Sequence, residues 1–260
     1  QFTENEFVPM SIANPITGAA EVVPETTEED ADTCTVLPQN GGGAVLVVAS
    51  TGTFNNCIFL RNKATGLEAN GGGILADQSS TLDIGKALFE GNTADQGTGG
   101  GIKFAARTSG TVSYTKFVAN TAINGYGGAI ASQDQDTKVD LKHIEVYGVR
   151  VLADMKYLTP VVNWYNNLTS PLNAFKSLSV MARGGGALYF EKTASLTIEN
   201  SFIVGTNAIK GGGIFITTKS TATVKSTTIE QCIADNGGGV YTADNSKFYM
   251  QDFSKLLNNI

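Results

Sequence analysis

The chain has 260 residues, of which 30 are glycine and 16% are charged, and its formal net charge is −6. This composition is typical of one elongated, Gly- and Thr-rich all-β domain. No apolar run is long enough to cross a membrane, and three cysteines are too few for a disulfide framework.

Residues 1–40 are predicted to form an acidic N-terminal segment or cap. They carry eight acidic side chains and no lysine or arginine, so the rest of the chain has a charge of about +2 (−6 minus −8). The densest acidic run, Glu21 to Asp32, is typical of a solvated linker or lid edge. A calcium site is the alternative, although a spaced Asp-x-Asp-x-Asp-Gly loop is missing. We expect part of this segment to cover the first coil of the domain that follows, because a bare end would expose unpaired strand groups.

From residue 41 to 260 one sequence pattern recurs. A phenylalanine is followed three residues later by asparagine, and a Gly-Gly-Gly or Gly-Gly-Ala triplet comes shortly after. Equivalent positions are 28 residues apart from Gly73 to Gly101 and from Gly101 to Ala129, and 26 apart from Gly213 to Gly239. A fixed period of this length is typical of a solenoid. The three clearest pairs are Phe59 with Asn62, Phe89 with Asn92, and Phe117 with Asn120.

A second apolar position stands five residues before each phenylalanine position, with a small residue between the two. The surrounding Thr, Val, Ile and Phe favour strands, and no helical spacing separates them. The pattern predicts a parallel β-helix of about seven to eight coils, in which equivalent side chains stack about 4.8 Å apart. The second column is Phe54, Ile84, Val112, Leu141, Ile198, Val224 and Phe248, and the small column includes Cys57, Ala87, Thr115, Ser201 and Thr227.

The glycine triplets and the asparagine column each have a structural and a chemical interpretation. A tight corner in every coil needs positive φ and close backbone approach, which glycine supplies. A nucleotide-binding loop would need one such triplet followed by a helix, and here the triplets recur without helices. The column of Asn62, Asn92 and Asn120 is interpreted as an internal hydrogen-bonded ladder rather than as catalytic.

These motifs carry a family resemblance. Phe117-Val-Ala-Asn120 followed by Gly127-Gly-Ala-Ile130 resembles the repeat of the chlamydial polymorphic membrane proteins and their relatives in eukaryotic microbes. The resemblance covers about residues 41–260. It implies a right-handed β-helix of the pectin-lyase type, displayed outside the cell in adhesion or surface architecture. An autotransporter assignment, and any contact with a membrane, would require sequence beyond this chain.

Residues 150–183 are predicted to be an insertion within the β-helix. The gap from Ala129 to Ala187 is 58 residues, twice the period, yet only one strand set, Val139 to Val146, occupies it. A degenerate extra coil is the alternative. Aromatic and basic residues are concentrated here, as at binding surfaces. An equal alternative is a loop folded onto the flank of the helix. The candidate partner-binding residues are Lys156, Tyr157, Trp164, Tyr165 and Lys176, and Asn167 begins a glycosylation sequon.

The cysteines and the last coil complete the chain. Cys57 falls in the small inward column and Cys232 in the asparagine column, so both are interpreted as packed thiols. A disulfide between Cys34 and Cys57, one coil away, is the alternative. The last coil is predicted to run from Phe248 to Phe253, with no polar cap or helix after it.

Candidate catalytic groups are sparse. The sole histidine, His143, is expected to be a solvated strand residue without a carboxylate partner. Arg61-Asn-Lys63 has the spacing of a substrate clamp but falls in the structural turn, and the close acid pair Asp134 and Asp136 lacks an opposing group. No triad and no metal-ligand spacing is found, and no cofactor is expected.

The sequence therefore favours a non-enzymatic, extracellular cell-surface protein. One hypothesis is an adhesin-like module that binds a surface protein or glycan through the insertion. A second is a filament or coat subunit that associates end to end, because an acidic N-terminal segment and a basic insertion of about +3 can meet across a contact. The alternative is a carbohydrate-active enzyme, a polysaccharide lyase or hydrolase. A start at Gln1 fits a processed, secreted chain, and no nucleic-acid partner is expected.

Overall fold

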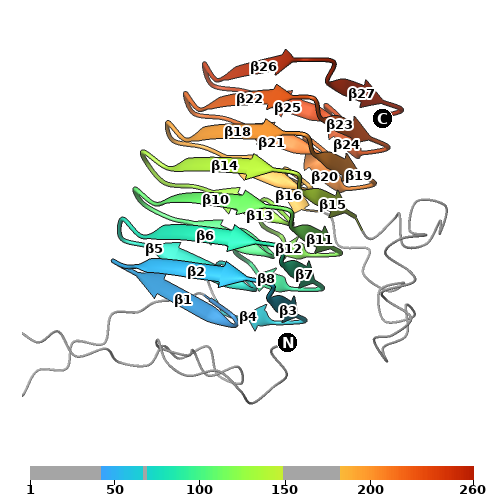
Figure 1. Ribbon diagram of the computed structural model, residues 1–260. Helices are drawn as coiled ribbons and strands as arrows, with labels where there is room; N and C mark the ends of the chain where they lie inside the picture. Colours follow the sequence, from blue (N-terminus) through green and yellow to red (C-terminus); the bar gives the residue numbers. More distant parts are fainter. Residues whose placement is uncertain (1–41, 67–68, 149–181) are drawn as a thin grey trace, which may run out of the picture.

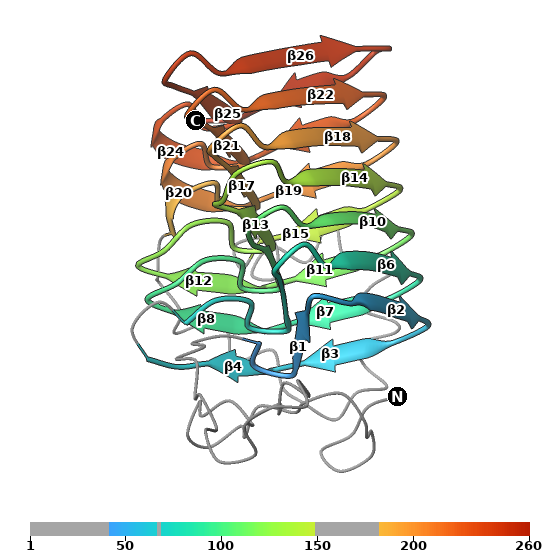
Figure 2. The same ribbon diagram turned by 90° about the vertical axis from the view of Figure 1, so that its left-hand side faces the viewer.

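The protein is a stack of short parallel β-strands (Figures 1 and 2). The computed structural model describes residues 42–66, 69–148 and 182–260, which contain 27 strands and no helix. Each circuit of the chain forms one layer of up to four strands, and the next circuit places the equivalent strands above it in parallel register. The all-β parallel solenoid expected from the repeat is thus confirmed.

Three sheets run the full height of the stack and have seven strands each. The first sheet contains β1 (Val45–Val48), β5 (Ile74–Asp77), β9 (Ile102–Phe104), β13 (Ile130–Ser132), β17 (Leu188–Phe190), β21 (Ile214–Ile216) and β25 (Val240–Thr242). The second contains β2 (Thr51–Asn55), β6 (Thr81–Gly85), β10 (Ser109–Ser113), β14 (Lys138–Lys142), β18 (Ser195–Glu199), β22 (Thr221–Lys225) and β26 (Lys247–Gln251). The third contains β3 (Ile58–Leu60), β7 (Leu88–Glu90), β11 (Lys116–Val118), β15 (Glu145–Tyr147), β19 (Phe202–Val204), β23 (Thr228–Glu230) and β27 (Lys255–Leu257).

The fourth side of the stack is divided into two short sheets. The lower one contains β4 (Lys63–Ala64), β8 (Thr93–Asp95) and β12 (Thr121–Ile123), and the upper one contains β16 (Ala182–Gly184), β20 (Asn207–Lys210) and β24 (Ile233–Asn236). Seven layers are joined by six steps, so the solenoid has about six turns, somewhat fewer than the seven to eight coils expected.

The phenylalanine column lies inside the stack, as predicted. Phe59, Phe89 and Phe117 are direct neighbours in the third sheet and are 3%, 0% and 0% exposed. Their ring centroids are 4.4 and 5.0 Å apart along the column. Val146, Ile203, Ile229 and Leu256 continue the column upward. Because each layer repeats the same buried positions, the core is continuous from one end of the stack to the other.

The asparagine ladder is also confirmed. The Oδ1 atom of Asn92 accepts hydrogen bonds from the backbone N–H and the Nδ2 of Asn62, at 3.0 and 2.8 Å. Its Nδ2 donates to Oδ1 of Asn120 and to the carbonyl of Phe59. The ladder therefore satisfies backbone groups at a turn that no strand pairing covers.

The glycine triplets form the corners that lead into the first sheet. In the third layer, Gly99 has a φ of +70°. A Cβ on the next residue, Gly100, would lie only 2.4 Å from the carbonyl oxygen of Gly128 in the layer above. The corner interpretation is thus supported by both backbone conformation and layer contact.

The last layer does not follow the predicted register. Met250, rather than Phe248, pairs with Val224, and Leu256, rather than Phe253, pairs with Ile229. The corner before the third sheet has one residue with positive φ in the layers below, but here both Asp252 and Phe253 adopt it. This extra residue makes the step from Met250 to Leu256 one residue longer than that from Val224 to Ile229, and it leaves Phe253 in the corner, 96% exposed.

The structure also corrects the prediction that Val139 to Val146 form one strand. β14 ends at Lys142, a corner follows, and β15 begins at Glu145. His143 occupies that corner with a φ of 52°, so it is exposed but does not belong to a strand.

The stack continues across the predicted insertion without an added layer in the large sheets. Ile130 of β13 pairs directly with Leu188 of β17, and the Ala129 N–H donates to the Ala187 carbonyl. This pairing argues against the extra-coil alternative. The chain leaves the described fold after Gly148 and returns at Ala182, in β16. This interruption lies where the fourth side divides, between β12 and β16.

Several predictions fall outside the described residues. These are the acidic segment and Cys34, the sequon at Asn167, and the candidate binding residues Lys156, Tyr157, Trp164, Tyr165 and Lys176. Cys57 and Cys232 are free, buried thiols, in agreement with the packed-thiol interpretation. Nothing in the described part of the chain forms a helix long and apolar enough to cross a membrane.

Candidate functional site

The residues weighed as catalytic groups are separated in the stack. Asn62 of the Arg61–Lys63 run is a rung of the asparagine ladder, and Lys63 pairs with Asp95 at 3.4 Å. Asp136 is exposed and contacts Thr193 of the next layer. Within residues 42–66, 69–148 and 182–260, no group of three His, Cys, Asp or Glu side chains is arranged to hold a metal ion.

An open groove crosses the outer surface where the second sheet turns into the third. It spans several layers around β11, β15, β19 and the corners that precede them. Because each of these strands is paired on both sides, side chains rather than strand edges line the groove. The lining residues are Tyr114, Lys116, His143, Ile144, Glu145, Tyr147, Asn200, Ser201, Phe202 and Ser226.

One wall of the groove is a column of corner residues. Tyr114, His143, Asn200 and Ser226 have φ values of 50°, 52°, 49° and 46°, and each stands in the same corner of a successive layer. The rings of Tyr114 and His143 stack with their centroids 4.6 Å apart and their planes 9° apart. Tyr114 is 60% exposed, so this ring pair stands at the surface.

The other wall combines a charge pair with two aromatic side chains. Lys116 Nζ lies 2.9 Å from Oε2 of Glu145, and the Tyr147 hydroxyl donates to the same oxygen at 3.0 Å. Burial raises the pKa of Tyr147, and the charge of Glu145 raises it further. Phe202 lies beside this set, half-buried. Among the groove residues, the one lysine and the one glutamate therefore neutralise each other.

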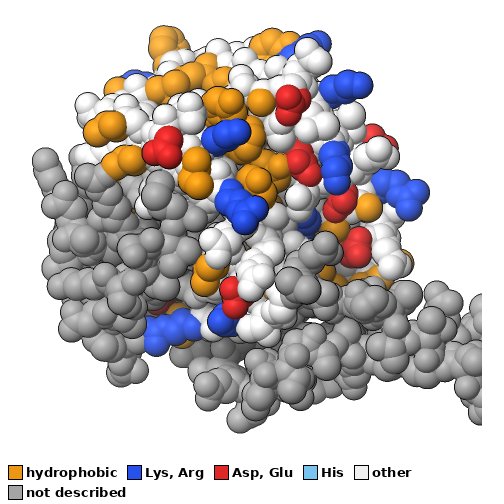
Figure 3. All heavy atoms as spheres, turned by 180° about the vertical axis from the view of Figure 1, so that it is seen from behind, with side chains coloured by type: hydrophobic (Ala, Val, Ile, Leu, Met, Phe, Trp, Pro, Cys, Tyr) orange, Lys and Arg blue, Asp and Glu red, His pale blue; other side chains and the backbone are white. Residues whose placement is uncertain are grey.

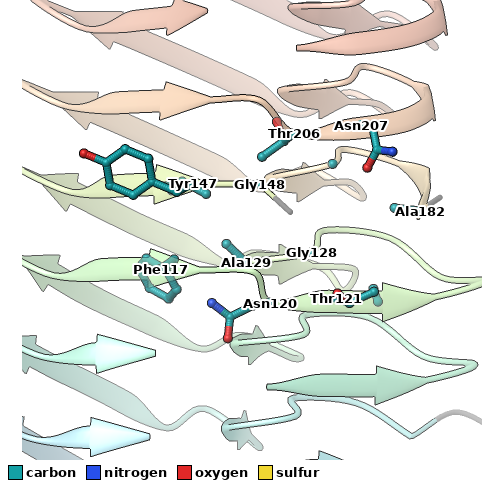
Figure 4. Close-up of a pocket in the computed structure, with 13 residues that line it drawn as sticks. Phe117, Asn120, Thr121, Gly128, Ala129, Tyr147, Gly148, Ala182, Thr206 and Asn207 are labelled. Atoms are coloured by element: carbon teal, nitrogen blue, oxygen red, sulfur yellow. The ribbon is translucent and has the colours of Figure 1, made fainter. Parts of the chain in front are cut away.

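A small cavity of about 30 Å³ lies behind the groove, at the break in the fourth side. Figure 4 shows it between Asn120 in the layer below and Thr206 in the layer above, with Gly148 and Ala182 beside it. Tyr147 lines both this cavity and the groove. The groove therefore ends at Tyr147, beside Gly148, where the chain leaves the described fold, while Ala182, where it returns, lines the cavity only.

A buried lysine lies on the outer side of the first sheet. Lys103 is 2% exposed, and its Nζ donates to Oγ1 of Thr98 at 2.8 Å and to Oε1 of Gln133 at 3.2 Å. Burial lowers its pKa to about 8, although the charges of Asp134 and Glu191 oppose this effect. Because its amine is enclosed and hydrogen-bonded, Lys103 is placed to hold neighbouring layers together.

Aromatic rings continue this outer side upward. Tyr126 stacks on Tyr189 at 4.4 Å, Tyr189 contacts Phe215 at 5.3 Å, and Phe215 contacts Tyr241 at 5.2 Å. Figure 3 shows hydrophobic side chains gathered on the upper part of the rear face, with basic and acidic side chains around them. Tyr189 and Phe215, in the middle of this column, are only 3% and 7% exposed and stabilise the stack, whereas Tyr126 and Tyr241 at its ends are half-buried.

The sequence reasoning missed most of the groove. A signal for Tyr114 and Phe202 is present in the sequence: each is an aromatic residue at an outward position where another layer carries a polar one, Asn200 and Thr228 respectively. It also missed that Asn259 belongs to the asparagine column. Asn259 accepts from the Cys232 N–H at 2.9 Å and donates to the Ile229 carbonyl. The spacing of Leu256 and Asn259 matches that of Phe59 and Asn62.

Comparison of the chain with protein-family models, with curated proteins and with solved structures found no match. The resemblance to the polymorphic membrane protein repeat therefore stays a prediction based on the sequence motifs.

Proposed function

We propose that this chain is a non-enzymatic, extracellular surface protein that works as an adhesin-like binding module. In this proposal a right-handed β-helix of the pectin-lyase type is the rigid support, and binding takes place on one side of it. The observation that carries the proposal is the position of the groove: it ends at Tyr147, next to Gly148, after which the sequence continues with the aromatic and basic residues 149–181. Binding residues commonly lie on such excursions from a rigid scaffold.

The chemistry of the groove favours binding over catalysis. The carboxylate of Glu145 is engaged by Lys116 and by the Tyr147 hydroxyl. The ring of His143 is stacked on Tyr114. Glycoside hydrolysis requires two carboxyl groups that flank the scissile bond, and only one carboxylate lines this groove. These arrangements support a surface that holds a ligand in place.

The test replaces residues 149–181 with a short Gly-Ser linker. Gly148 and Ala182 line the same small cavity, so a short connection can join them. We expect the variant to keep the thermal unfolding profile of the full chain and to lose adhesion to host-cell or matrix-coated surfaces. Adhesion that survives the replacement contradicts the proposal. Degradation of polyuronates by the full chain, with or without calcium, would favour the enzyme alternative instead.

End-to-end association is the second candidate function, and the last layer favours it. Met250, Leu256 and Leu257 are 37%, 46% and 39% exposed, and Met250 and Leu256 occupy columns that are buried in the layers below. A further layer in the same register would cover them, whether from a second copy or from the same polypeptide. Light scattering at high protein concentration tests this: assembly that is lost in Met250→Asp supports the filament, and a persistent monomer rejects it.

A further inference from the structure

Asn-Gly pairs stand at or beside the corners that lead into the first sheet. Asn70-Gly71 and Asn236-Gly237 occupy the same corner position in the second layer and in the last layer, and Asn124-Gly125 lies just before this corner in the fourth. In such a pair the backbone nitrogen of glycine can attack the side-chain amide carbon of asparagine, because glycine has no Cβ to obstruct the approach. Whether it does so depends on how firmly the two groups are held.

The N–H of the corner glycine is used to bind the layer above. In the layers below the last one it donates to a backbone carbonyl of the next layer, at 2.8 to 3.0 Å; the donors are Gly71, Gly99, Gly127, Gly185 and Gly211. Gly237 holds this position in the last layer, where it is exposed, and its N–H makes no hydrogen bond within the described residues. The nitrogen that would attack is therefore available only in this layer.

The asparagine side chains differ in the same way. Oδ1 of Asn70 accepts hydrogen bonds from the N–H of Thr98 at 3.0 Å and from its Oγ1 at 2.8 Å. Gly125 is buried, and its N–H and carbonyl both form backbone hydrogen bonds, at 3.3 and 2.7 Å. Asn236 is exposed, and its side-chain amide has no hydrogen-bond partner in the part of the chain that the structure describes. It ends β24, which pairs only with β20 below it.

We propose that Asn236 is a site of spontaneous deamidation, in which the Gly237 nitrogen is the nucleophile and water is the co-reactant. The nitrogen loses its proton and attacks Cγ of Asn236, a C–N bond closes a succinimide ring, and the side-chain nitrogen leaves with that proton as ammonia. Water then opens the ring at either carbonyl and gives aspartate or isoaspartate. The net change is water consumed and ammonia released. This inference goes beyond the proposed function and does not depend on it.

The reaction changes the charge and the backbone of the last layer. Lys210 pairs in register with Asn236, and its Nζ lies 5.7 Å from the centroid of the Tyr241 ring. The new carboxylate therefore arises beside a lysine. The isoaspartate product also lengthens the main chain immediately before Gly237, which has a φ of +65°. Since this corner leads into β25, the added atom alters the entry to the last strand of the first sheet.

The experiment incubates the full chain at mildly alkaline pH and physiological temperature, at a low protein concentration that keeps the last layer uncovered. Trypsin then separates the three pairs into the peptides 64–86, 117–138 and 226–247, and mass spectrometry measures the amide-to-acid change in each. Because every hydrogen bond that must open slows the reaction, we expect Asn236 to deamidate at least about tenfold faster than Asn70 or Asn124. A smaller ratio, or a faster reaction at Asn70 or Asn124, overturns the inference.

Two controls assign the reaction to the folded corner. In urea the three pairs lose their hydrogen bonds and should react at similar rates; a difference that persists there comes from the local sequence, and the inference is wrong. Asn236→Gln keeps an exposed amide but disfavours the ring closure, so the change in the peptide 226–247 should disappear. If it remains, it arises at Asn245 in the same peptide, and Asn236 is not the site.

Amide hydrogen exchange gives a readout that does not require the reaction. Gly211 and Gly237 occupy the same corner in successive layers, but only Gly211 donates its N–H, to the carbonyl of Asn236. We expect the Gly237 amide to exchange at least about tenfold faster than the Gly211 amide. Equal protection of the two amides would show that the Gly237 nitrogen is engaged and would contradict the proposal.

Discussion

In the lower three layers the inward column of the third sheet consists of Phe59, Phe89 and Phe117, whereas Val146, Ile203, Ile229 and Leu256 form it in the four layers above. The polar column beside it changes as well, from an unbroken asparagine ladder to Thr206, Cys232 and Asn259. Strand pairing nevertheless continues in the same parallel register through both halves.

The comparison shows what fixes the fold and what can vary. Both halves keep the glycine with positive φ at the corner before the first sheet, as at Gly99 below and Gly211 above. Both also keep a corner residue with positive φ before the third sheet, as at Lys86 and Asn200. The corners and the alternation of inward side chains therefore set the register, while the filling of the core is exchangeable between aromatic and aliphatic residues.

The largest expected effect comes from placing a charge in the aromatic half. Phe89→Asp puts an unpaired carboxylate between two stacked rings at a position with 0% exposure, and we expect it to destabilise the fold by more than about 4 kcal/mol. The matched control is Phe253→Asp, since Phe253 is 96% exposed. Urea unfolding followed by circular dichroism measures both. Similar midpoints for the two variants would contradict the assignment of Phe89 to the core.

The second-largest loss of stability is expected in the polar column beside the core, which is the asparagine ladder in the lower half and contains Thr206 in the upper half. Asn92→Ala removes a side chain with four hydrogen bonds, to Asn62, Asn120 and the Phe59 carbonyl, and should cost about 3 kcal/mol. Thr206→Val removes the hydrogen bond to the Gly212 carbonyl at 2.7 Å and the weaker contact with Cys232 Sγ at 3.2 Å, and should cost about 1 kcal/mol. Denaturant midpoints compare them directly. Equal losses would show that the ladder holds the lower half no more strongly than Thr206 holds the upper half.

Lys103 provides a test by pH. Its pKa is lowered to about 8 in the folded state, from about 10.5. Between these values the unfolded chain binds more protons than the folded chain, so this group makes stability rise with pH. Below pH 8 the cost of burying the charge is fully present. In addition to Asp134 and Glu191, the charges of Asp77 and Lys192 act on it.

The comparison variant is Lys103→Leu, which copies the neighbour Leu75. From pH 7 to 10.5, the unfolding free energy of the wild type should rise relative to the variant by about 3 kcal/mol. Burial raises the pKa of Cys57, Cys232, Tyr147 and Tyr189 as well, so these groups also make stability depend on pH, but they are common to both proteins and cancel in the difference. Urea unfolding at a series of pH values gives this difference. A difference that is flat with pH would contradict the burial of the amine.

The smallest effect is expected at the surface of the lower half. Asp95 ends strand β8 and pairs with Lys63, whose side chain is 51% exposed. Asp95→Ala should change stability by less than about 0.5 kcal/mol, because exposed ion pairs contribute little. Thermal unfolding measures this change. If Asp95→Ala loses several kcal/mol of unfolding free energy, the ion pair contributes more to stability than an exposed pair should, and the prediction is wrong.

The sequence was sufficient for the architecture because the repeat is a physical constraint on every layer. The positions represented by Phe59, Asn62 and the corner glycines recur in successive repeats, and only one stacked arrangement buries all of the repeated side chains. The columns, the sheets and the asparagine ladder could therefore be predicted. The last layer was mispredicted because Phe248 and Phe253 repeat the five-residue spacing of the two apolar columns. The structure instead uses Met250 and Leu256, which are six residues apart because the corner between them holds both Asp252 and Phe253.

The groove was harder to predict for a different reason. Its corner residues Tyr114, His143 and Asn200 are 29 and 57 residues apart in the sequence, and they come together only because their layers are neighbours in the stack. The sequence pattern predicts that His143 lies in a strand, whereas the structure places it in the corner column. Lys103 likewise gives no local signal, because its burial comes from the way neighbouring layers pack around its outer position.

The most direct test of the central claim is an electron-density map from crystals of the chain, read at the phenylalanine column. The structure predicts the rings of Phe59, Phe89 and Phe117 in consecutive layers, with centroids 4.4 and 5.0 Å apart and Val146 paired above them. A map that places these three rings in separate parts of the molecule would contradict the continuous parallel stack and the groove on its surface.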